Sequence, residues 1–236
     1  MIKVEIKNVS LRYPIYGFND YSIRNVAINT LVGGKLLQKN KDLSIEALRD
    51  INFVAIDGDR IGLYGHNGSG KTTLLRVIIG VLKPTDGKIV TDGEISSMLS
   101  LNMGIDLSFT ARELIKLKSK FMNLSLEKEK RLMDDVIEFT ELNQYIDLPL
   151  YTFSTGMMMR LSFAIATHDR ADILVLDEWL SAGDEKFSIK AHDRMKAFIK
   201  KSGLLFLATH DKNLLANTCN KIITLEKGEI KGVERT

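Results

Sequence analysis

Two short groups of residues carry side chains that could bind phosphate groups and cleave a bond between them. The first is the run Gly65-His66-Asn67-Gly68-Ser69-Gly70-Lys71-Thr72, which fits G-x-x-x-x-G-K-[ST] and lies between an expected strand, 61–64, and an expected helix. Glycines let backbone N–H groups turn toward phosphate oxygens, and the positive end of the helix dipole adds to the attraction. We expect Lys71 to reach the β- and γ-phosphates of a nucleotide and Thr72 to bind Mg²⁺.

The second group is Asp177-Glu178, which follows the apolar run 173–176 and lies 105 residues after Thr72. Asp177 is suited to the Mg²⁺ shell, and Glu178 could accept a proton from an attacking water as a general base. An apolar strand that ends in two carboxylates is by itself more often a solvated strand end. The phosphate-binding run elsewhere in the chain favours the catalytic interpretation.

The elements that would hold these groups alternate between apolar strands and amphipathic helices. Helical spacing begins at Thr72 and recurs over 111–121, 125–142, from near Ser154, and over 185–200. Strand character is found near 4–11, 51–55, 61–64, 88–90, 94–99, 173–176 and 204–208, with a final hairpin at Lys227-Gly228. Continuous apolar strands between helices are typical of a buried parallel sheet, so we predict an α/β fold.

Composition indicates a globular protein in a reducing compartment. Of the 236 residues 44% are hydrophobic, and the net charge of +3 gives no reason to expect a nucleic-acid partner. The single cysteine, Cys219, excludes an internal disulfide, and no Cys/His group has zinc-ligand spacing. The N-terminus lacks an apolar signal region, and the longest stretch without charged residues, 148–159, is shorter than the roughly twenty apolar residues of a membrane span. Any membrane role should therefore be peripheral.

Three further groups complete an ordered set. Phe153-Ser154-Thr155-Gly156-Met157 precedes an Arg-bearing helix, Ser181-Ala182-Gly183-Asp184 follows the two carboxylates, and His210 follows strand 204–208. In this order and spacing, the chain resembles the nucleotide-binding subunit of ATP-binding cassette (ABC) transporters over nearly its whole length. The resemblance implies one cassette domain: a P-loop NTPase core with an N-terminal antiparallel β region (about 1–104 and 171–236), an inserted helical signature subdomain (about 105–170) and a basic insertion (17–47).

The resemblance also implies a site shared between two copies of the chain. A homodimer would hold two ATP molecules head to tail, each between the phosphate loop of one protomer and the signature of the other. The implied catalytic residues are Glu178, His210 and Lys71, and Mg²⁺ would be held by Thr72 and, through water, by Asp177. The implied nucleotide contacts are Tyr13, Gly65, His66, Asn67, Gly68, Ser69, Gly70, Lys71, Thr72 and Thr73, and those of the opposite protomer are Ser154, Thr155, Gly156 and Met157.

Two assignments within this set stay open. Tyr13 lies where the family stacks an aromatic ring on adenine, but Tyr16 is close enough to take that place, and either could be core. Where the family usually has a glutamine that senses Mg²⁺ and the permease, the chain has Ser100 in SMLSLNMGID. The usual role of that glutamine is therefore in doubt here.

Departures from the family pattern point to one branch of it. The signature reads FSTGM with three consecutive methionines, 157–159, and Trp179 follows the Asp-Glu pair, as in subunits that export lipid-linked polysaccharides such as O-antigen or capsule. Residues 21–41 carry four basic and no acidic side chains, with apolar residues on one helical face, which suggests a membrane surface, a phosphorylated lipid or a permease contact; a solvated loop is the alternative.

The resemblance therefore implies an integral-membrane permease as partner, a lipid-linked polysaccharide as indirect cargo, and a cytoplasmic, peripheral location on the inner face of the membrane. The nearest alternatives are another cargo such as teichoic acid, a non-transport ABC ATPase acting on nucleic acid or ribosomes, and a nucleotide-binding regulator. The 82 positions from Thr72 to Ser154 leave no room for the long coiled coils of many non-transport members. The presence of Glu178 and His210 disfavours a regulator without hydrolysis.

Overall fold

A computed structural model of the protein describes residues 2–15, 35–39, 42–99, 105–178 and 185–236. The chain forms two compact units. The first comprises Met1–Ser96, Asp172–Trp179 and Gly203–Thr236, and the second comprises Ser97–Ala171 and Leu180–Ser202. The second unit thus takes in a helix near residue 190 in addition to the segment 105–170 expected from the sequence. Tyr16, Ser100, Trp179 and the loop 181–184 lie outside the described residues, as does most of the insertion 17–47.

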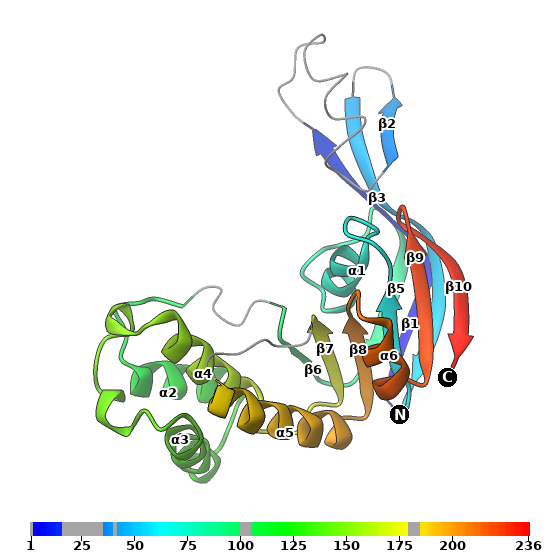
Figure 1. Cartoon of the computed structure of the whole chain (residues 1–236). Coiled ribbons are helices and arrows are strands. Elements are labelled where there is room, and N and C mark those ends of the chain that lie inside the picture. The colour runs from blue at the N-terminus through cyan, green and yellow to red at the C-terminus, as the bar shows by residue number, and fades with distance from the viewer. Residues whose placement is uncertain (1, 16–34, 40–41, 100–104, 179–184) are drawn as a thin grey trace. The chain divides into compact units, whose positions relative to one another are not determined.

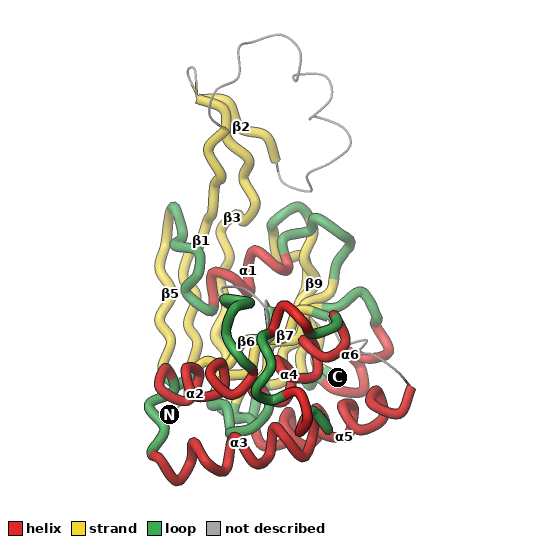
Figure 2. The backbone as a smooth tube through the Cα atoms, turned by 90° about the vertical axis from the view of Figure 1, so that its left-hand side faces the viewer, coloured by secondary structure: helices red, strands yellow, loops and turns green. Residues whose placement is uncertain are grey.

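An antiparallel sheet forms one part of the first unit. Its strands are β1 (Lys3–Ile15), β2 (Lys35–Lys39), β3 (Asp42–Ile56) and β5 (Asp86–Asp92), in the order β2-β3-β1-β5. Figure 2 shows β1, β3 and β5 as long neighbouring strands. Val4 and Ile6 of β1 are buried, as their alternation in the sequence predicted. The expected antiparallel β region is confirmed.

A six-stranded sheet forms the other part of the first unit (Figure 1). Its strands are β4 (Arg60–Tyr64), β6 (Ile95–Ser97), β7 (Ile173–Asp177), β8 (Leu204–Ala208), β9 (Lys221–Glu226) and β10 (Glu229–Arg235), in the order β10-β9-β4-β8-β7-β6. The four central strands β9, β4, β8 and β7 pair in parallel. All residues of β8 and four of the five of β7 are buried, which explains their continuous apolar sequences and confirms the predicted α/β class.

The described part of the first unit contains two helices in addition to these sheets. Helix α1 (Lys71–Ile78) contacts β3 and β5 of the antiparallel sheet and β7 and β8 of the parallel one. It ends at Ile78, and Gly80, which adopts a left-handed conformation with φ of 77°, follows shortly after. Helix α6 (Lys212–Thr218), which the sequence reading did not anticipate, is capped by Asp211 and contacts β4.

In the second unit the described residues form four helices: α2 (Ala111–Phe121), α3 (Leu126–Thr140), α4 (Thr155–Ala166) and α5 (Glu185–Lys201). Short 3-10 turns at Asn143–Tyr145 and Leu150–Thr152 connect α3 to α4. The side chains of Thr110, Ser125 and Ser154 cap the first three helices by accepting a backbone N–H bond. These caps explain why the helices begin where the sequence predicted.

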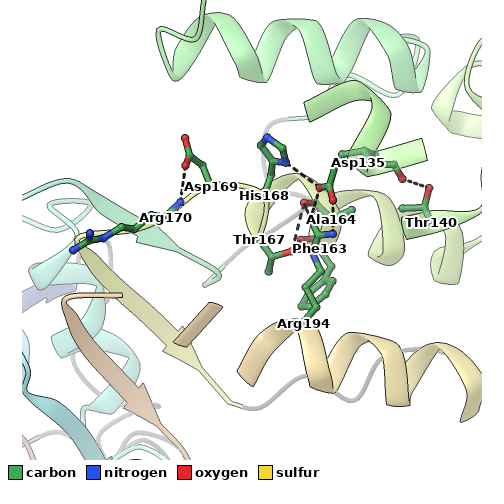
Figure 3. Close-up of polar contacts among 10 residues, drawn as sticks. Asp135, Thr140, Phe163, Ala164, Thr167, His168, Asp169, Arg170 and Arg194 are labelled. Carbon is green, nitrogen blue, oxygen red and sulfur yellow. Dashed lines mark hydrogen bonds and ion pairs between the residues drawn. The ribbon is translucent and has the colours of Figure 1, made fainter. Parts of the chain in front are cut away.

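A polar cluster ties α3, α4 and α5 together inside this unit (Figure 3). From α5, the guanidinium of Arg194 donates through Nη1 to Asp135 Oδ1 on α3, at 2.9 Å. It also donates through Nε to Thr167 Oγ1 at 2.7 Å and through Nη2 to the carbonyl of Ala164 at 3.0 Å, both at the end of α4. His168 Nδ1 lies 2.9 Å from Asp135 Oδ2. Arg194 therefore links its own helix, α5, to α3 and to the end of α4.

Candidate active site

The loop between β4 and α1, residues 65–70, requires glycine at both ends. A Cβ atom on Gly65 would lie 2.3 Å from the carbonyl oxygen of Leu225 and 2.5 Å from Ser69 Oγ, so no larger residue fits without movement. Gly70, which directly precedes α1, has a φ of 107°, and its Cβ would lie 3.0 Å from the carbonyl oxygen of Ala47. The glycines of the motif are thus explained by the path of the backbone.

Backbone hydrogen bonds from the turn between β9 and β10 stabilise this loop. Gly228 N–H, in the turn between β9 and β10, donates to the carbonyl of Ser69 at 3.0 Å, and Arg49 N–H of β3 donates to the carbonyl of Gly228 at 2.8 Å. Ser69 is fully buried, and its hydroxyl has no hydrogen-bond partner among the described residues. The sequence analysis placed Gly228 in a hairpin but did not connect it with the loop, because the partners of a main-chain hydrogen bond cannot be read from residue types.

Lys71 and Thr72 lie at the start of α1, next to the end of β7. Lys71 Nζ donates to the carbonyls of Gly65 at 2.7 Å and His66 at 3.1 Å, within its own loop. Burial lowers the pKa of the Lys71 ammonium, although the Asp177 carboxylate opposes the shift. Thr72 Oγ1 donates to Asp177 Oδ2 at 2.6 Å, which joins the two motifs that lie far apart in the sequence.

Glu178 follows β7 directly and has an unusual backbone conformation. Its φ is 68°, in the left-handed region that non-glycine residues rarely adopt. Its N–H donates to the carbonyl of Ala208 at the end of β8, at 2.7 Å, which holds this turn. His210 Nδ1 lies 3.5 Å from Glu178 Oε1, and both side chains are exposed. Strained backbone of this kind is often found at functional sites.

The residues around His210 were not identified from the sequence. Asp211 N–H donates to Thr209 Oγ1 at 3.1 Å, and the Asp211 carboxylate caps α6 by accepting from Asn213 N–H at 2.9 Å. Lys212 Nζ lies 5.8 Å from the centroid of the Tyr64 ring, at the end of β4. An Asp shortly after a buried strand and ahead of Leu214 and Leu215 is a helix-capping signal, and it could have revealed α6.

The signature residues belong to the second unit. Ser154 is exposed and precedes α4, and its Oγ accepts from Met157 N–H at 3.2 Å. Thr155 is exposed and Gly156 is partly exposed in the first turn of the helix. Free N–H groups at a helix start attract anions, so this end of α4 has the chemistry expected of a phosphate contact.

The remaining candidates lie near the loop or on β1. His66, Asn67 and Gly68 are exposed at the tip of the loop, and Thr73 is partly buried in α1. Tyr13 is partly buried in β1, where it pairs with Ile45 of β3. Lys71, Thr72, Asp177, Glu178 and His210 are thus grouped at the ends of β4, β7 and β8 in one unit.

The donor atoms in this group suit a hard divalent cation. No group of three or more His, Cys, Asp or Glu side chains that could hold a metal occurs in the described part of the chain. A hydroxyl and one carboxylate, Thr72 and Asp177, fit Mg²⁺ because this ion keeps several waters and takes further ligands from substrate phosphates. None of the helices in the described ranges is both long and apolar enough to span a bilayer.

Sequence comparison places the chain among known proteins. Residues 48–181 match the family described as ABC transporter. The chain is 36% identical over 231 residues to an O-antigen export system ATP-binding protein of Yersinia enterocolitica, with 98% of this chain and 97% of that protein covered. It is 37% identical to a teichoic acids export ATP-binding protein of Staphylococcus haemolyticus, with 98% and 83% covered.

Solved structures agree on the fold. An ATP-binding subunit of an ABC transporter has a TM-score of 0.72 at 20% sequence identity, with 98% of this chain and 89% of that chain covered. A dimeric ATP-binding cassette in a post-hydrolysis state, bound to ADP and Pi, has a TM-score of 0.69 at 23% identity, with 98% of both chains covered. At these identities the likeness concerns the fold alone.

Proposed function

Because the chain belongs to the ABC transporter family, we propose that it is the ATP-hydrolysing subunit of an exporter that moves a lipid-linked polysaccharide across the cytoplasmic membrane. The observation that carries the ATPase assignment is the 2.6 Å hydrogen bond between Thr72 and Asp177, with Glu178 and Lys71 beside them. This arrangement combines phosphate binding, a place for a metal ion and a proton acceptor. The export assignment rests on the relatives in Yersinia and Staphylococcus.

In the proposed mechanism the loop 65–70 surrounds the phosphates of ATP with backbone N–H groups. The start of α1 adds its positive dipole end. Lys71 Nζ leaves the carbonyls of Gly65 and His66 and binds the β- and γ-phosphates, which compensates for the desolvation that lowers its pKa. Tyr13 stacks on the adenine ring.

Hydrolysis then depends on side chains at the ends of β7 and β8. Thr72 and Asp177 would hold Mg²⁺, which when bound neutralises charge on the phosphate oxygens. The Glu178 carboxylate accepts a proton from the attacking water, and His210, 3.5 Å away, orients the water and the γ-phosphate. The left-handed backbone at Glu178 fixes the direction in which its carboxylate leaves the strand.

The proposed assembly is a homodimer under a separate integral-membrane permease. Each ATP would contact the loop of one protomer and Ser154, Thr155, Gly156 and Met157 of the other. Closure on ATP and opening after hydrolysis would drive the permease from the cytoplasmic face of the membrane. The dimeric cassette of similar fold supports this arrangement.

The proposed cargo is a polymer of the O-antigen or capsule type. The relative in Yersinia enterocolitica matches along 97% of its length and is named for O-antigen export. Teichoic acid is the alternative, because the Staphylococcus haemolyticus protein named for its export is equally similar in sequence.

Deletion of the gene in its own organism, followed by complementation, tests this function. Wild-type protein should restore the surface polymer, and Lys71→Ala should not, although it should be present in equal amount. Analysis of the polymer that accumulates inside the deletion strain then identifies the cargo. Normal surface polymer in the deletion strain, or in the strain that makes only Lys71→Ala, would contradict the proposal.

A further inference from the structure

Figure 1 shows helices α2 and α3, which follow one another along the chain. Large apolar side chains are exposed where the turn joins them. Phe121 is 76% exposed and Leu126 is 85% exposed, the two highest values among the exposed large hydrophobic residues, and Met122 is 39% exposed. Single exposed apolar residues are normal on protein surfaces. These three lie within six positions of one another, and apolar groups exposed together mark contacts with partners or membranes.

Hydrogen bonds hold this turn in place. Met122 N–H donates to the carbonyl of Lys118, and Leu124 N–H donates to the carbonyl of Ser119, both at 3.0 Å. Ser119 Oγ, which is buried, donates to Glu129 Oε2 of α3 at 2.7 Å and so joins the two helices. The apolar side chains are therefore displayed by an ordered turn.

The same segment carries a local excess of positive charge. Residues 116–131, here called the basic turn, contain six cationic side chains, Lys116, Lys118, Lys120, Lys128, Lys130 and Arg131, and two acidic ones, Glu127 and Glu129. Glu127 pairs with Arg131, and Glu129 accepts from Ser119. None of the five lysines forms an ion pair with any residue that the structure describes. Lys128 moreover lies in the first turn of α3, where the helix dipole disfavours a cation.

We propose that the basic turn binds the anionic surface of a lipid bilayer. Phe121, Met122 and Leu126 would enter the boundary between headgroups and acyl chains, and the unpaired lysines would bind the lipid phosphates. Charge complementarity selects this partner, because none of these lysines forms an ion pair with a described carboxylate. Lys116 alone acts on nearby carboxylates, since its charge helps to lower the pKa values of Glu113 and Asp147. The contact goes beyond the proposed function and rests on it only in placing the chain beside a membrane.

Sedimentation of the purified full-length protein with vesicles tests this contact. Wild type should bind vesicles of equimolar phosphatidylglycerol and phosphatidylcholine, and should not bind phosphatidylcholine alone. Replacing Lys116, Lys120 and Lys128 by glutamine should lower the partition coefficient by at least about tenfold, since each lysine near an anionic surface contributes several-fold. A matched variant changes the exposed Lys83, Lys88 and Lys196 to glutamine, which alters the net charge equally, and should bind as wild type.

A probe at one residue reports on insertion of the turn itself. Cys219 is the single cysteine and is buried, so a Cys219→Ser, Leu126→Cys protein can carry one environment-sensitive fluorophore. Its emission should shift to the blue with anionic vesicles, whereas a label at Ile189→Cys, also exposed, should not respond. No vesicle binding by wild type, equal loss in both lysine triples, or binding only when a permease is present in the vesicles would each overturn the proposal.

Turnover of ATP is measured on the same variants. The basic turn contains none of the residues assigned to ATP binding or hydrolysis, so its variants should hydrolyse ATP in solution at the wild-type rate. Loss of vesicle binding with normal turnover would support the lipid contact. Absence of turnover in wild type would count against the proposed function without bearing on the vesicle result.

Discussion

At the scale of single residues, the candidate site depends on backbone geometry as much as on side-chain type. Glu178 follows a buried strand in a left-handed conformation, and its N–H is bound to the carbonyl of Ala208. The sequence predicted the role of this residue from its place after Asp177. The sequence did not predict the strained backbone, because a non-glycine residue at positive φ is fixed by contacts from a neighbouring strand.

Replacing Glu178 by glutamine tests its role as the general base. The amide keeps the size and the hydrogen-bonding capacity but cannot accept the proton, so kcat should fall by at least about a hundredfold. ATP affinity should persist, and dimers should accumulate with Mg-ATP in size-exclusion chromatography. Glu234→Gln, an exposed carboxylate in β10, is the matched control and should hydrolyse ATP normally. Wild-type turnover in Glu178→Gln would remove this residue from the catalytic role.

A methyl group at Gly65 tests how closely the phosphate loop is packed. Gly65→Ala would place Cβ 2.3 Å from the Leu225 carbonyl oxygen, so the loop has to move. Overpacking of this kind costs roughly 1–3 kcal/mol, and we expect ATP affinity to fall by about tenfold. In Gly232→Ala the new Cβ meets nothing within 4 Å, so affinity should not change. Calorimetric titration with ATP measures both; equal affinities would show that the loop accommodates the methyl group.

At the scale of elements, the sequence identified most helices and strands because their patterns are local. The helix over 111–121 and the strand over 204–208 have the predicted bounds, and the comparisons confirm the family and the ATPase class. Helix α6 was missed because it has only seven residues and one fully buried side chain, Leu215, which is too little for a helical period. The brace of Gly228 on the phosphate loop was also missed, since it involves main-chain atoms alone.

The grouping of the helices also depends on contacts that the sequence does not reveal. Arg194 lies on α5, which follows β7 along the chain. Its guanidinium nevertheless contacts α3 and the end of α4. It also lies 4.3 Å from the centroid of the Phe139 ring. Helical periodicity identifies an arginine on a helix face, but it does not identify the carboxylate on another helix that will bind it. The network could therefore be found only in the structure.

The network around Asp135 predicts how this helical unit responds to acid. Burial by itself raises the pKa of the Asp135 carboxyl, but hydrogen bonds from His168 and Arg194 outweigh it and lower the value to about 2. A carboxyl pKa that is lower in the folded state stabilises that state at any pH above the ordinary pKa of the group, 3.8. This contribution is lost as the pH falls toward about 2. Because the side chain is 34% exposed, we expect about 1–2 kcal/mol after allowance for solvent screening.

Urea unfolding of Asp135→Asn measures this contribution. At neutral pH the variant should be less stable than wild type by about 1–2 kcal/mol, and the difference should disappear as the pH approaches 2. Asp134→Asn, at the exposed neighbouring position on α3, should match wild type throughout. A difference between Asp135→Asn and wild type that does not change with pH would show that the charge of Asp135 is not the source of the stability.

At the scale of the whole molecule, the two sets of candidate residues belong to different units of the chain. The phosphate loop and Glu178 lie in the first unit, and Ser154 and Gly156 lie in the second. Ser154 uses its hydroxyl to cap its own helix, so an N-cap role would suffice to explain a serine at this position. The proposed head-to-tail dimer gives the exposed start of α4 a second role, as a contact for the γ-phosphate bound by the other protomer. This role requires two chains, so only an experiment that combines two different chains can test it.

A mixture of two defective proteins tests this shared site. Lys71→Ala removes the phosphate contact of the loop, and Ser154→Arg blocks the start of α4; both are placed in the Glu178→Gln background to trap dimers. Each variant alone has two defective sites. In a mixed dimer one site combines both defects and the other combines an intact loop with an intact signature. One intact site should support association with Mg-ATP, so differently tagged chains should copurify only when mixed.

Ser125→Arg is the matched control, because Ser125 caps α3 in the same way, and this variant should associate by itself. Association of Ser154→Arg alone, or no association in the mixture, would mean that the signature of one protomer does not complete the site of the other.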